Sequence, residues 1–330
     1  MSRINFARKT AALGLALAAC ALPAAAFADA ADAAELSQKL YNEVGEYKYD
    51  ETPARLAKIQ GLLDQGADPK GQPMFLAASY KIVAPFELFL PKIGDVNTPI
   101  QENGETLLLF VLNQAEQSKA SEADLRMVKG LIKAGANVNV LAQGDSATPL
   151  NTAARKGSPE LIKLLLDSGA DAKAVRPNGF TPLTGPGASN LEVIKLLVAA
   201  GANPYQVTQT GSTPLHHVCE RAFEMNGQPD PQAAQRIALL LKKGSSIDAY
   251  HEQHGTFPVG TPLEEAARSD NPDCVAALIK AGSSLKAPAF PESYLAKYPQ
   301  AKQKTVQEYV LSAAEESPTL YTEEVVKLFK

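Results

Sequence analysis

Apolar and polar residues recur along this chain with the spacing of short amphipathic helices, and one pattern is repeated many times. In its clearest copy, residues 147–172, Thr148-Pro149 precedes an apolar stretch that ends at Gly157, and a second, leucine-rich stretch ends at Gly169. A threonine hydroxyl caps a helix start, proline fits the first helical turn, and glycine ends helices because it adopts the left-handed conformation. The pattern predicts two short antiparallel helices whose apolar flanks must be buried against neighbouring units.

The sequence supplies these neighbours at regular intervals. Two sets of positions alternate along the chain. Helices are expected to open at positions 72, 106, 148, 181, 213 and 261, and glycines expected to close units lie at positions 66, 94, 135, 169, 201, 244 and 282. T-P-L, A-A, L-L and G-A motifs follow one another with a period near 33 residues. These residues resemble the ankyrin repeat over about residues 35–286. The resemblance implies an all-α solenoid of about six helix-turn-helix repeats, with β-hairpin-like loops, here called fingers, between successive units.

The repeats divide the chain into four expected parts. Residues 1–28 form a signal peptide, residues 29–70 contain the N-terminal cap helices, residues 71–286 are the repeats, and residues 287–330 contain the C-terminal capping helices. Residues 29–34 are expected to be a short tether before the first cap helix. Capping helices are needed because the two ends of a solenoid would otherwise expose an apolar flank.

Several units depart from the common length. The insertion at 113–124 is polar and helix-prone, so we expect it to lengthen both helices of its unit by about a turn. The insertion at 221–232 contains glycine and proline and predicts a loop. In the unit that opens at Thr181, Gly185 and Pro186 oppose a helix, so its inner helix should shrink to a single turn. The finger at 245–260 is enlarged, and the finger after position 66 is truncated.

The N-terminus has the pattern of a bacterial secretory signal peptide. Basic residues precede an apolar run at 11–26 that is rich in small residues. Cleavage is expected between Ala28 and Asp29. A membrane anchor is disfavoured because Pro23 interrupts a run that is shorter than the roughly 20 residues that span a bilayer. The alternative is a lipoprotein anchored at Cys20, within Leu-Ala-Ala-Cys. Export to the periplasm is the favoured expectation.

Charge narrows the class of partner. The full chain has 32 Lys and Arg against 36 Asp and Glu, and removal of residues 1–28 takes away three basic residues, which leaves a net charge near −7. A nucleic-acid partner would require a basic face. No segment after the signal is apolar enough to span a membrane. The predicted partner is therefore a protein, and the chain itself is expected to be a monomer.

No residue pattern predicts an enzyme or a bound cofactor. His216 lies in T-P-L-H, where the resemblance implies a local hydrogen bond that holds the finger to the helix. His251 and His254 could bind a metal in the enlarged finger, but the sequence offers no clear third ligand, so this metal-binding or enzymatic role is kept as the alternative. Glu264-Glu265 is expected to lie on a solvated face. Cys219 and Cys274 occupy core positions, and buried thiols are favoured over a disulfide.

Binding is expected where side chains of fingers and inner helices are not needed for packing. Phe180 and Tyr250 are the strongest candidates, because aromatic residues on exposed loops are enriched among binding hot spots. The full set of candidates is Gln143, Asp145, Arg176, Asn178, Phe180, Gln209, Thr210, Ser212, Tyr250, His251, His254 and Phe257. The repeat resemblance implies a protein-binding scaffold, and one that masks or modulates an envelope protein, in the manner of an immunity protein, is its more specific form. A lipid-anchored envelope scaffold is a further alternative.

Overall fold

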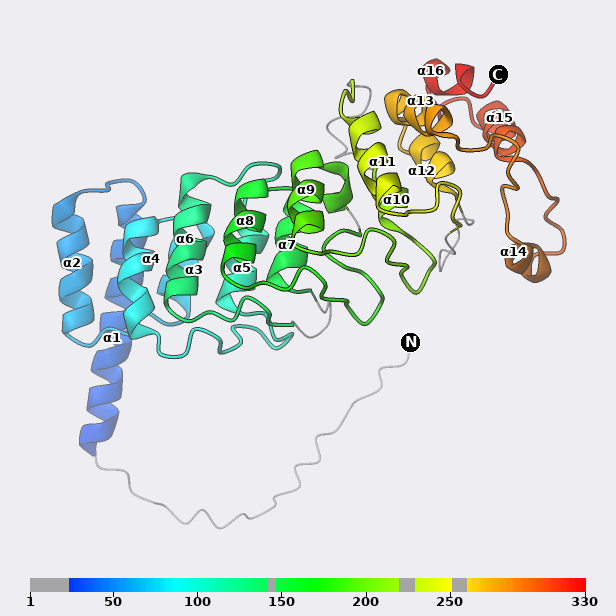
Figure 1. The fold of residues 1–330 in the computed structure, drawn as a ribbon. Helices are drawn as coiled ribbons and strands as arrows, with labels where there is room; N and C mark the ends of the chain where they lie inside the picture. The colour runs from blue at the N-terminus through cyan, green and yellow to red at the C-terminus, as the bar shows by residue number, and fades with distance from the viewer. Residues whose placement is uncertain (1–23, 142–146, 185, 220–228, 251–259) are drawn as a thin grey trace, which may run out of the picture.

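Short antiparallel helix pairs stack side by side in two layers, with the fingers projecting from one edge (Figure 1). The computed structural model describes residues 24–141, 147–184, 186–219, 229–250 and 260–330. The inner layer contains α1 (Ala24–Tyr47), α3 (Gln72–Ser79), α5 (Leu107–Gln114), α7 (Pro149–Lys156), the 3-10 helix η2 (Pro186–Ser189), α10 (Pro214–His217), α12 (Pro262–Arg268) and α15 (Val306–Glu316). The outer layer contains α2 (Pro53–Asp64), α4 (Val83–Phe89), α6 (Glu122–Lys133), α8 (Pro159–Asp167), α9 (Leu191–Ala199), α11 (Ala233–Lys242), α13 (Pro272–Ala281) and α16 (Glu323–Lys327).

Two further short helices lie beside these rows. The 3-10 helix η1 (Leu90–Lys92) continues α4, and α14 (Glu292–Lys297) projects from the C-terminal end (Figure 1). The segment that carries α14 is closed at its base by a bridge between Pro288 and Thr305. The described residues contain isolated bridges but no β-strand, and none of their helices is long and apolar enough to cross a membrane. The all-α solenoid expected from the sequence is confirmed.

The unit at 147–172 forms as its residues predict. Thr148 caps α7, its Oγ1 accepting a hydrogen bond from the Asn151 backbone at 3.2 Å, and Gly157 ends the helix with φ 68°. Ser158 caps α8, and Leu161 and Leu165 are completely buried. Core residues of this kind run in one cluster from α1 to α16, so each unit is stabilised by its neighbours.

Asparagine side chains tie the bases of successive fingers together. The Asn97 amide donates to the Gly135 carbonyl at 3.0 Å, and its Oδ1 accepts from the next finger's backbone at 2.6 Å. Asn139 repeats the arrangement one unit later, donating to the Gly169 carbonyl and accepting from the Asp171 amide, both at 2.9 Å. These bonds satisfy the carbonyl groups of the glycines that follow the outer helices and tie the base of each finger to the next.

The insertion at 113–124 differs from its expected form. The inner helix α5 has 8 residues, as α7 has, and only the outer helix α6, with 12 residues, is longer than its counterpart α8, with 9. Residues 115–121 are not helical, because their backbone hydrogen-bonds to the next unit. The Ser118 amide donates to the Lys156 carbonyl at 2.7 Å. The expectation that both helices lengthen is therefore wrong for the inner one.

The unit that opens at Thr181 has lost its inner α-helix, as its sequence predicts. A turn held by Thr184 Oγ1, which accepts from the Thr181 amide at 2.6 Å, precedes η2. Between α7 and α10, η2 thus takes the place of a full inner α-helix. The 221–232 insertion lies mostly outside the described residues, and its described part, residues 229–232, is not helical.

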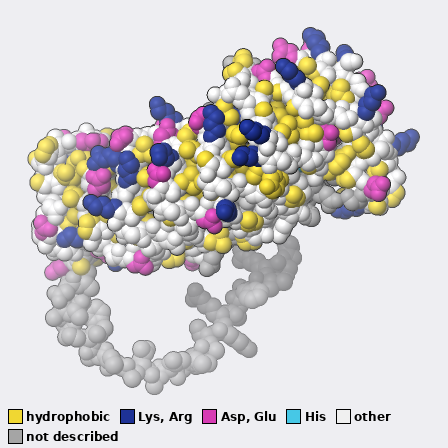
Figure 2. Space-filling view, in the orientation of Figure 1, with side chains coloured by type: hydrophobic (Ala, Val, Ile, Leu, Met, Phe, Trp, Pro, Cys, Tyr) yellow, Lys and Arg dark blue, Asp and Glu magenta, His cyan; other side chains and the backbone are white. Residues whose placement is uncertain are grey.

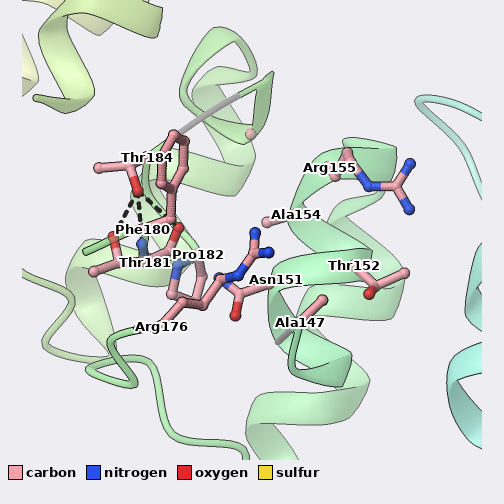
Figure 3. A pocket seen from close by; sticks show the side chains of 11 residues that line it. Ala147, Asn151, Thr152, Ala154, Arg155, Arg176, Phe180, Thr181, Pro182 and Thr184 are labelled. Atoms are coloured by element: carbon pink, nitrogen blue, oxygen red, sulfur yellow. Dashed lines mark hydrogen bonds between the residues drawn. The ribbon is translucent and has the colours of Figure 1, made fainter. Parts of the chain in front are cut away.

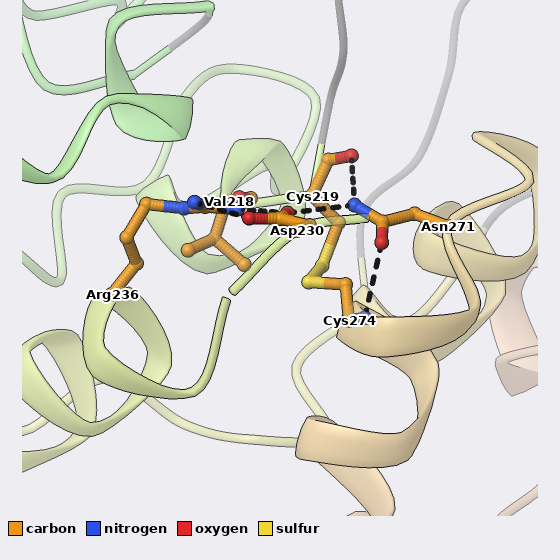
Figure 4. Close-up of a disulfide and its surroundings, with 6 residues drawn as sticks. All are labelled: Val218, Cys219, Asp230, Arg236, Asn271 and Cys274. Atoms are coloured by element: carbon orange, nitrogen blue, oxygen red, sulfur yellow. Dashed lines mark hydrogen bonds and ion pairs between the residues drawn. A yellow bond between two sulfur atoms is a disulfide. The ribbon is translucent and has the colours of Figure 1, made fainter. Parts of the chain in front are cut away.

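The two cysteines of the repeats form a disulfide, which overturns the preference for buried thiols (Figure 4). Both residues occupy core positions, as expected, with Cys219 1% and Cys274 0% exposed. Stacking of the units brings two residues 55 apart in sequence to a Cα–Cα distance of 5.9 Å, well within the range for a bridge. The disulfide joins the end of α10 to the start of α13.

A buried ionic network reinforces the same junction (Figure 4). Arg236, 4% exposed, makes two hydrogen bonds to the Asp230 carboxylate, at 2.9 and 2.6 Å, and a third to the Val218 carbonyl at 3.1 Å. Asn271 donates to Asp230 at 2.9 Å and accepts from the Cys274 amide at 3.1 Å. The network joins Val218, Asp230 and Arg236 to Asn271 beside the disulfide, so the last two repeats are firmly joined.

The N-terminal cap differs from expectation at its start. Helix α1 begins at Ala24, so residues 29–34 belong to a helix and are not an irregular tether. The expected cleavage point between Ala28 and Asp29 lies within this helix, and the signal peptide remains a prediction. At the other end, α15 and α16 extend the inner and outer layers by one more pair, and Val306, Val310 and Phe329 are buried there.

Candidate protein-binding surface

The fingers form a row of tight turns at the edge of the inner layer. In the finger of residues 169–181, the Arg176 amide donates to the Phe180 carbonyl and the Gly179 amide donates to the Arg176 carbonyl, both at 2.8 Å. The next finger repeats this turn between Thr208 and Ser212. A Cβ atom on Gly179 would lie 2.7 Å from Thr208 Cα, so the close approach of the two fingers requires glycine here.

The structure brings most of the described candidate residues together on these two fingers. The Gln209 amide donates to the Asn178 carbonyl at 3.1 Å, and Asn178 and Gln209 are both exposed. Thr210 is half-buried and shares a hydrogen bond with a neighbouring threonine. Ser212 is buried and hydrogen-bonds to His217 at 2.7 Å, so its side chain serves the fold and is the least accessible of the set.

The two favoured aromatic residues have different surroundings. Phe180 is half-buried, with its ring centroid 6.1 Å from that of His217 and 6.0 Å from the Arg176 guanidinium. The Tyr250 hydroxyl donates to the Pro288 carbonyl, and burial raises the pKa of Tyr250. Tyr250 therefore connects the enlarged finger to the C-terminal segment, whereas Phe180 lies near Arg176 and His217.

Five candidates cannot be placed. Gln143, Asp145, His251, His254 and Phe257 lie outside the described residues. The described part of the chain contains no cluster of three histidine, cysteine, aspartate or glutamate side chains suited to a metal ion. The metal-binding alternative for the finger at 245–260 thus gains no support from the residues that are described.

Exposed apolar side chains on the fingers were not identified from the sequence. Leu141, Val175 and Val207 each lie six residues after a closing glycine, and they are 51%, 55% and 52% exposed. Tyr205, on the same finger as Val207, is 55% exposed. Four of the seven exposed large hydrophobic residues of the described chain thus lie on three consecutive fingers. Their common register was visible in the sequence and could have revealed them.

The distribution of charge agrees with this arrangement. Figure 2 shows most Lys, Arg, Asp and Glu side chains over the upper part of the molecule, where Figure 1 places the outer helices, and a large hydrophobic area right of centre. Large exposed apolar surface is uncommon on proteins that do not bind a partner. The finger side of the molecule is therefore its candidate binding surface.

A pocket opens where the inner helix of the 181 unit is missing (Figure 3). About 560 Å³ of space, which includes open solvent, lies between α7 and the finger of residues 169–181. Its lining residues are Ala147, Asn151, Thr152, Ala154, Arg155, Arg176, Phe180, Thr181, Pro182, Thr184 and Gly187. Two candidates, Arg176 and Phe180, thus belong to one pocket. Asn151 and Arg155, on α7 of the clearest repeat copy, were not among the candidates named from the sequence.

A second pocket lies where the first finger is truncated. Met74 and Phe75 of α3, together with Ile93, Val96 and Ile100, line about 760 Å³ that again includes open solvent. A longer first finger would cover part of α3, so the deletion leaves this surface accessible. Both pockets therefore arise from departures from the common repeat.

One expected surface residue is buried instead. Glu264 is 1% exposed, because it caps α12: its Oε2 accepts from the Thr261 amide at 2.7 Å. Burial raises the pKa of Glu264 to about 7. The expectation of a solvated face is wrong for Glu264, while its neighbour Glu265 is half-buried and pairs with Arg268 at 3.1 Å.

Stacked helix pairs with fingers along one edge define a class of repeat protein that presents one long curved surface. The family model for ankyrin repeats, in three copies, matches residues 117–185 and 187–289, which is just over half of the chain. The chain therefore belongs to the ankyrin-repeat family. The two matches adjoin at residue 186, where η2 begins in place of an inner α-helix.

A solved structure supports the fold. The crystal structure of the human ASB11 ankyrin repeat domain is similar to this chain, with a TM-score of 0.55 and 22% sequence identity over 79% of this chain and 98% of that one. A comparison of the sequence with curated proteins gives no match. Ankyrin repeats generally mediate protein–protein interactions, so the fold indicates a protein-binding scaffold.

Proposed function

We propose that this protein is an exported scaffold of the bacterial envelope that binds another protein with its fingers and inner layer. Its more specific role is to mask or modulate that partner, in the manner of an immunity protein. The repeat family supports the binding of a protein.

The observation that carries the proposal is the row of apolar side chains on consecutive fingers. Leu141, Val175 and Val207 repeat at one register, and Tyr205 adds an aromatic side chain beside Val207. Residues that stabilise the fold are buried in the layers, so these exposed ones contribute little to packing. Binding hot spots combine such apolar and aromatic contacts near the centre of an interface.

Two features support export. The N-terminal sequence has the basic, apolar and small-residue pattern of a signal peptide, with Ala28-Asp29 at its end. The Cys219–Cys274 disulfide suits an oxidising compartment such as the periplasm, since cytosolic proteins seldom keep structural disulfides. The lipoprotein form anchored at Cys20 would place the same scaffold at a membrane surface.

Site-directed photo-crosslinking followed by affinity measurement tests the binding surface. A photoreactive residue at Tyr205 should capture the partner in the native envelope, whereas one at the exposed outer-helix residue Lys163 should not. With the captured protein purified, V175D combined with V207D should weaken binding about tenfold or more, because two apolar contacts are replaced by charges.

The matched control is L320D, which changes an exposed leucine of the C-terminal cap, 45% exposed, in the same way. It should leave the affinity unchanged. If the finger variant binds as tightly as the wild type, or if both positions capture the same protein, the surface assignment is wrong.

A further inference from the structure

The fourth residue of the T-P-L motif differs from unit to unit, although it has one common role. Asn151, Thr184, His216 and Glu264 each accept a hydrogen bond from the backbone of the threonine that opens the motif. His216 has a second role: its Nε2 bonds to the Ala249 carbonyl in the following finger at 2.9 Å. A histidine at this position thus caps its helix with one ring nitrogen and holds the next finger with the other.

Asn151 performs the first role but not the second. Its Oδ1 accepts from the Thr148 amide at 3.3 Å and from the Thr148 hydroxyl at 2.8 Å. Its Nδ2 group has no hydrogen-bond partner among the described residues, although Asn151 is only 9% exposed. Asn151 lines a pocket, so this amide group without a protein partner is available for an acceptor from outside.

The space beside this amide is the pocket at the shortened repeat (Figure 3). Gly187 packs closely against α7 and forms part of the wall: a Cβ atom on it would lie 2.9 Å from the Ala154 carbonyl oxygen. The shortened unit therefore brings its backbone close to α7 without filling the volume next to Asn151.

The charged side chains among the described lining residues of this pocket are both cationic. Arg155 and Arg176 line it, and none of its described lining residues is an aspartate or glutamate. Figure 3 shows Arg176 extending from its finger toward Asn151, with Phe180 on the side of the shortened unit, while Arg155 points away from the centre. Arg155 donates to Asn113 at 2.7 Å and adds its charge at the rim.

We propose that this pocket binds a carboxylate group of the kind carried by glutamate. The carboxylate accepts a hydrogen bond from Asn151 Nδ2 in the field of the two arginines, and the methylene groups pack against the Phe180 ring. The carboxylate comes from a side chain of the bound protein or from a free small carboxylate. The first source rests on the proposed function, whereas the existence of the site does not.

An NMR titration with a defined probe tests the site without knowledge of the partner. N-acetylglutamate methylamide should shift the side-chain amide resonances of Asn151 and the backbone resonance of Phe180. The glutamine analogue, equal in shape but uncharged, should bind about tenfold more weakly, because charge-assisted hydrogen bonds are the stronger ones. Absence of a shift with the glutamate probe, or equal shifts with both probes, overturns the proposal.

N151D removes the donor and adds a negative charge, but it keeps the oxygen that accepts from Thr148, so α7 keeps its cap. The variant should lose the response to the glutamate probe. The matched control is N103D, which makes the same change at an exposed finger residue whose Oδ1 accepts from the Glu105 amide at 2.9 Å. N103D should respond as the wild type does, and loss of the response in both variants contradicts a local site.

The partner captured at Tyr205 distinguishes the two sources. Weaker binding of that protein to N151D supports a carboxylate side chain of the partner as the ligand. Unchanged binding, together with a glutamate response in the wild type, supports a free carboxylate. Failure of the finger variants to affect partner binding would refute the proposed function and leave the outcome of the titration unaffected.

Discussion

Glu264 provides a sharp test of the packing at the C-terminal end of the solenoid. Its side chain is 1% exposed, with Oε2 held by the Thr261 amide, while Oε1 has no hydrogen-bond partner among the described residues. Burial raises the pKa of Glu264 from 4.5 to about 7, and the hydrogen bond from Thr261 and the charge of Arg268 oppose this rise without cancelling it. The variant to make is E264Q, which keeps an acceptor for Thr261 and cannot ionise.

The raised pKa means that the folded protein holds this proton at pH values where the unfolded chain has lost it. Between pH 4.5 and 7 the folded state binds more protons, so the free energy of unfolding decreases as the pH rises. A shift from 4.5 to about 7 corresponds to roughly 3 kcal/mol. We therefore expect E264Q to match the wild type near pH 4.5 and to exceed its stability by up to about 3 kcal/mol at pH 8.

The measurement is urea unfolding by circular dichroism from pH 4.5 to 8, together with amide hydrogen exchange of α12, because a solenoid can unfold unit by unit. E265Q is the control, since it removes a charge beside the same Arg268 from a half-buried position. A difference between E264Q and wild type that stays constant across this pH range would refute the reasoning from burial. A pH-dependent difference of the same size in E265Q would assign the effect to the loss of charge alone.

Three further predictions follow from other parts of the molecule. Replacing Cys219 and Cys274 by serine should lower the free energy of unfolding by about 4 kcal/mol, as expected for opening a loop of 55 residues, and urea unfolding with and without reductant should show equal values for the variant. Intact mass spectrometry of the exported chain should give an N-terminus at Asp29, whereas a diacylglyceryl group on Cys20 would contradict the cleavage assignment. G179A should speed amide hydrogen exchange in the neighbouring finger, because its Cβ would lie 2.7 Å from that finger's backbone at φ 83°; unchanged exchange would show that the two fingers are not in firm contact.

Local signals in the sequence predicted most of the fold. Thr148 and Gly157 bound α7 because hydroxyl caps and left-handed glycines act within a few residues. The reduced helix after Thr181 was predicted for the same reason, since Gly185 and Pro186 disfavour helix whatever surrounds them. Period and motif then fixed how the units stack.

Features that depend on contact between units were not predictable in this way. The Cys219–Cys274 pair forms only because α10 and α13 meet after stacking, and no local pattern encodes their distance. The insertion at 113–124 has helix-forming residues, but its backbone hydrogen-bonds to the following unit, and this tertiary contact outweighs local propensity. Glu264 shows the same limit, because a carboxylate beside another on a short helix is usually solvated.

The candidate site was predicted only in part. Residues that the repeat does not need for packing were identified, whereas a residue that caps its own helix was not. Arg176 and Phe180 were identified because the repeat does not need them, and they do line the pocket. Asn151 was passed over because it belongs to the most regular unit. Its position in the motif requires one acceptor atom to cap the helix, which asparagine, threonine, histidine and glutamate all provide.

In His216, Glu264 and Asn151, the side chain at this fourth motif position has a second polar atom that does not take part in the cap. What this atom contacts depends on the surroundings of each unit. In His216 it reaches the next finger and strengthens the stack, and in Glu264 it is a buried oxygen without a hydrogen-bond partner among the described residues. In Asn151 it is an amide donor at a pocket lined by two arginines. The same motif position therefore has three different consequences. His216 strengthens the stack, Glu264 makes stability depend on pH, and Asn151 is the proposed binding group. The consequence depends on how far the side chain extends and what lies beyond it.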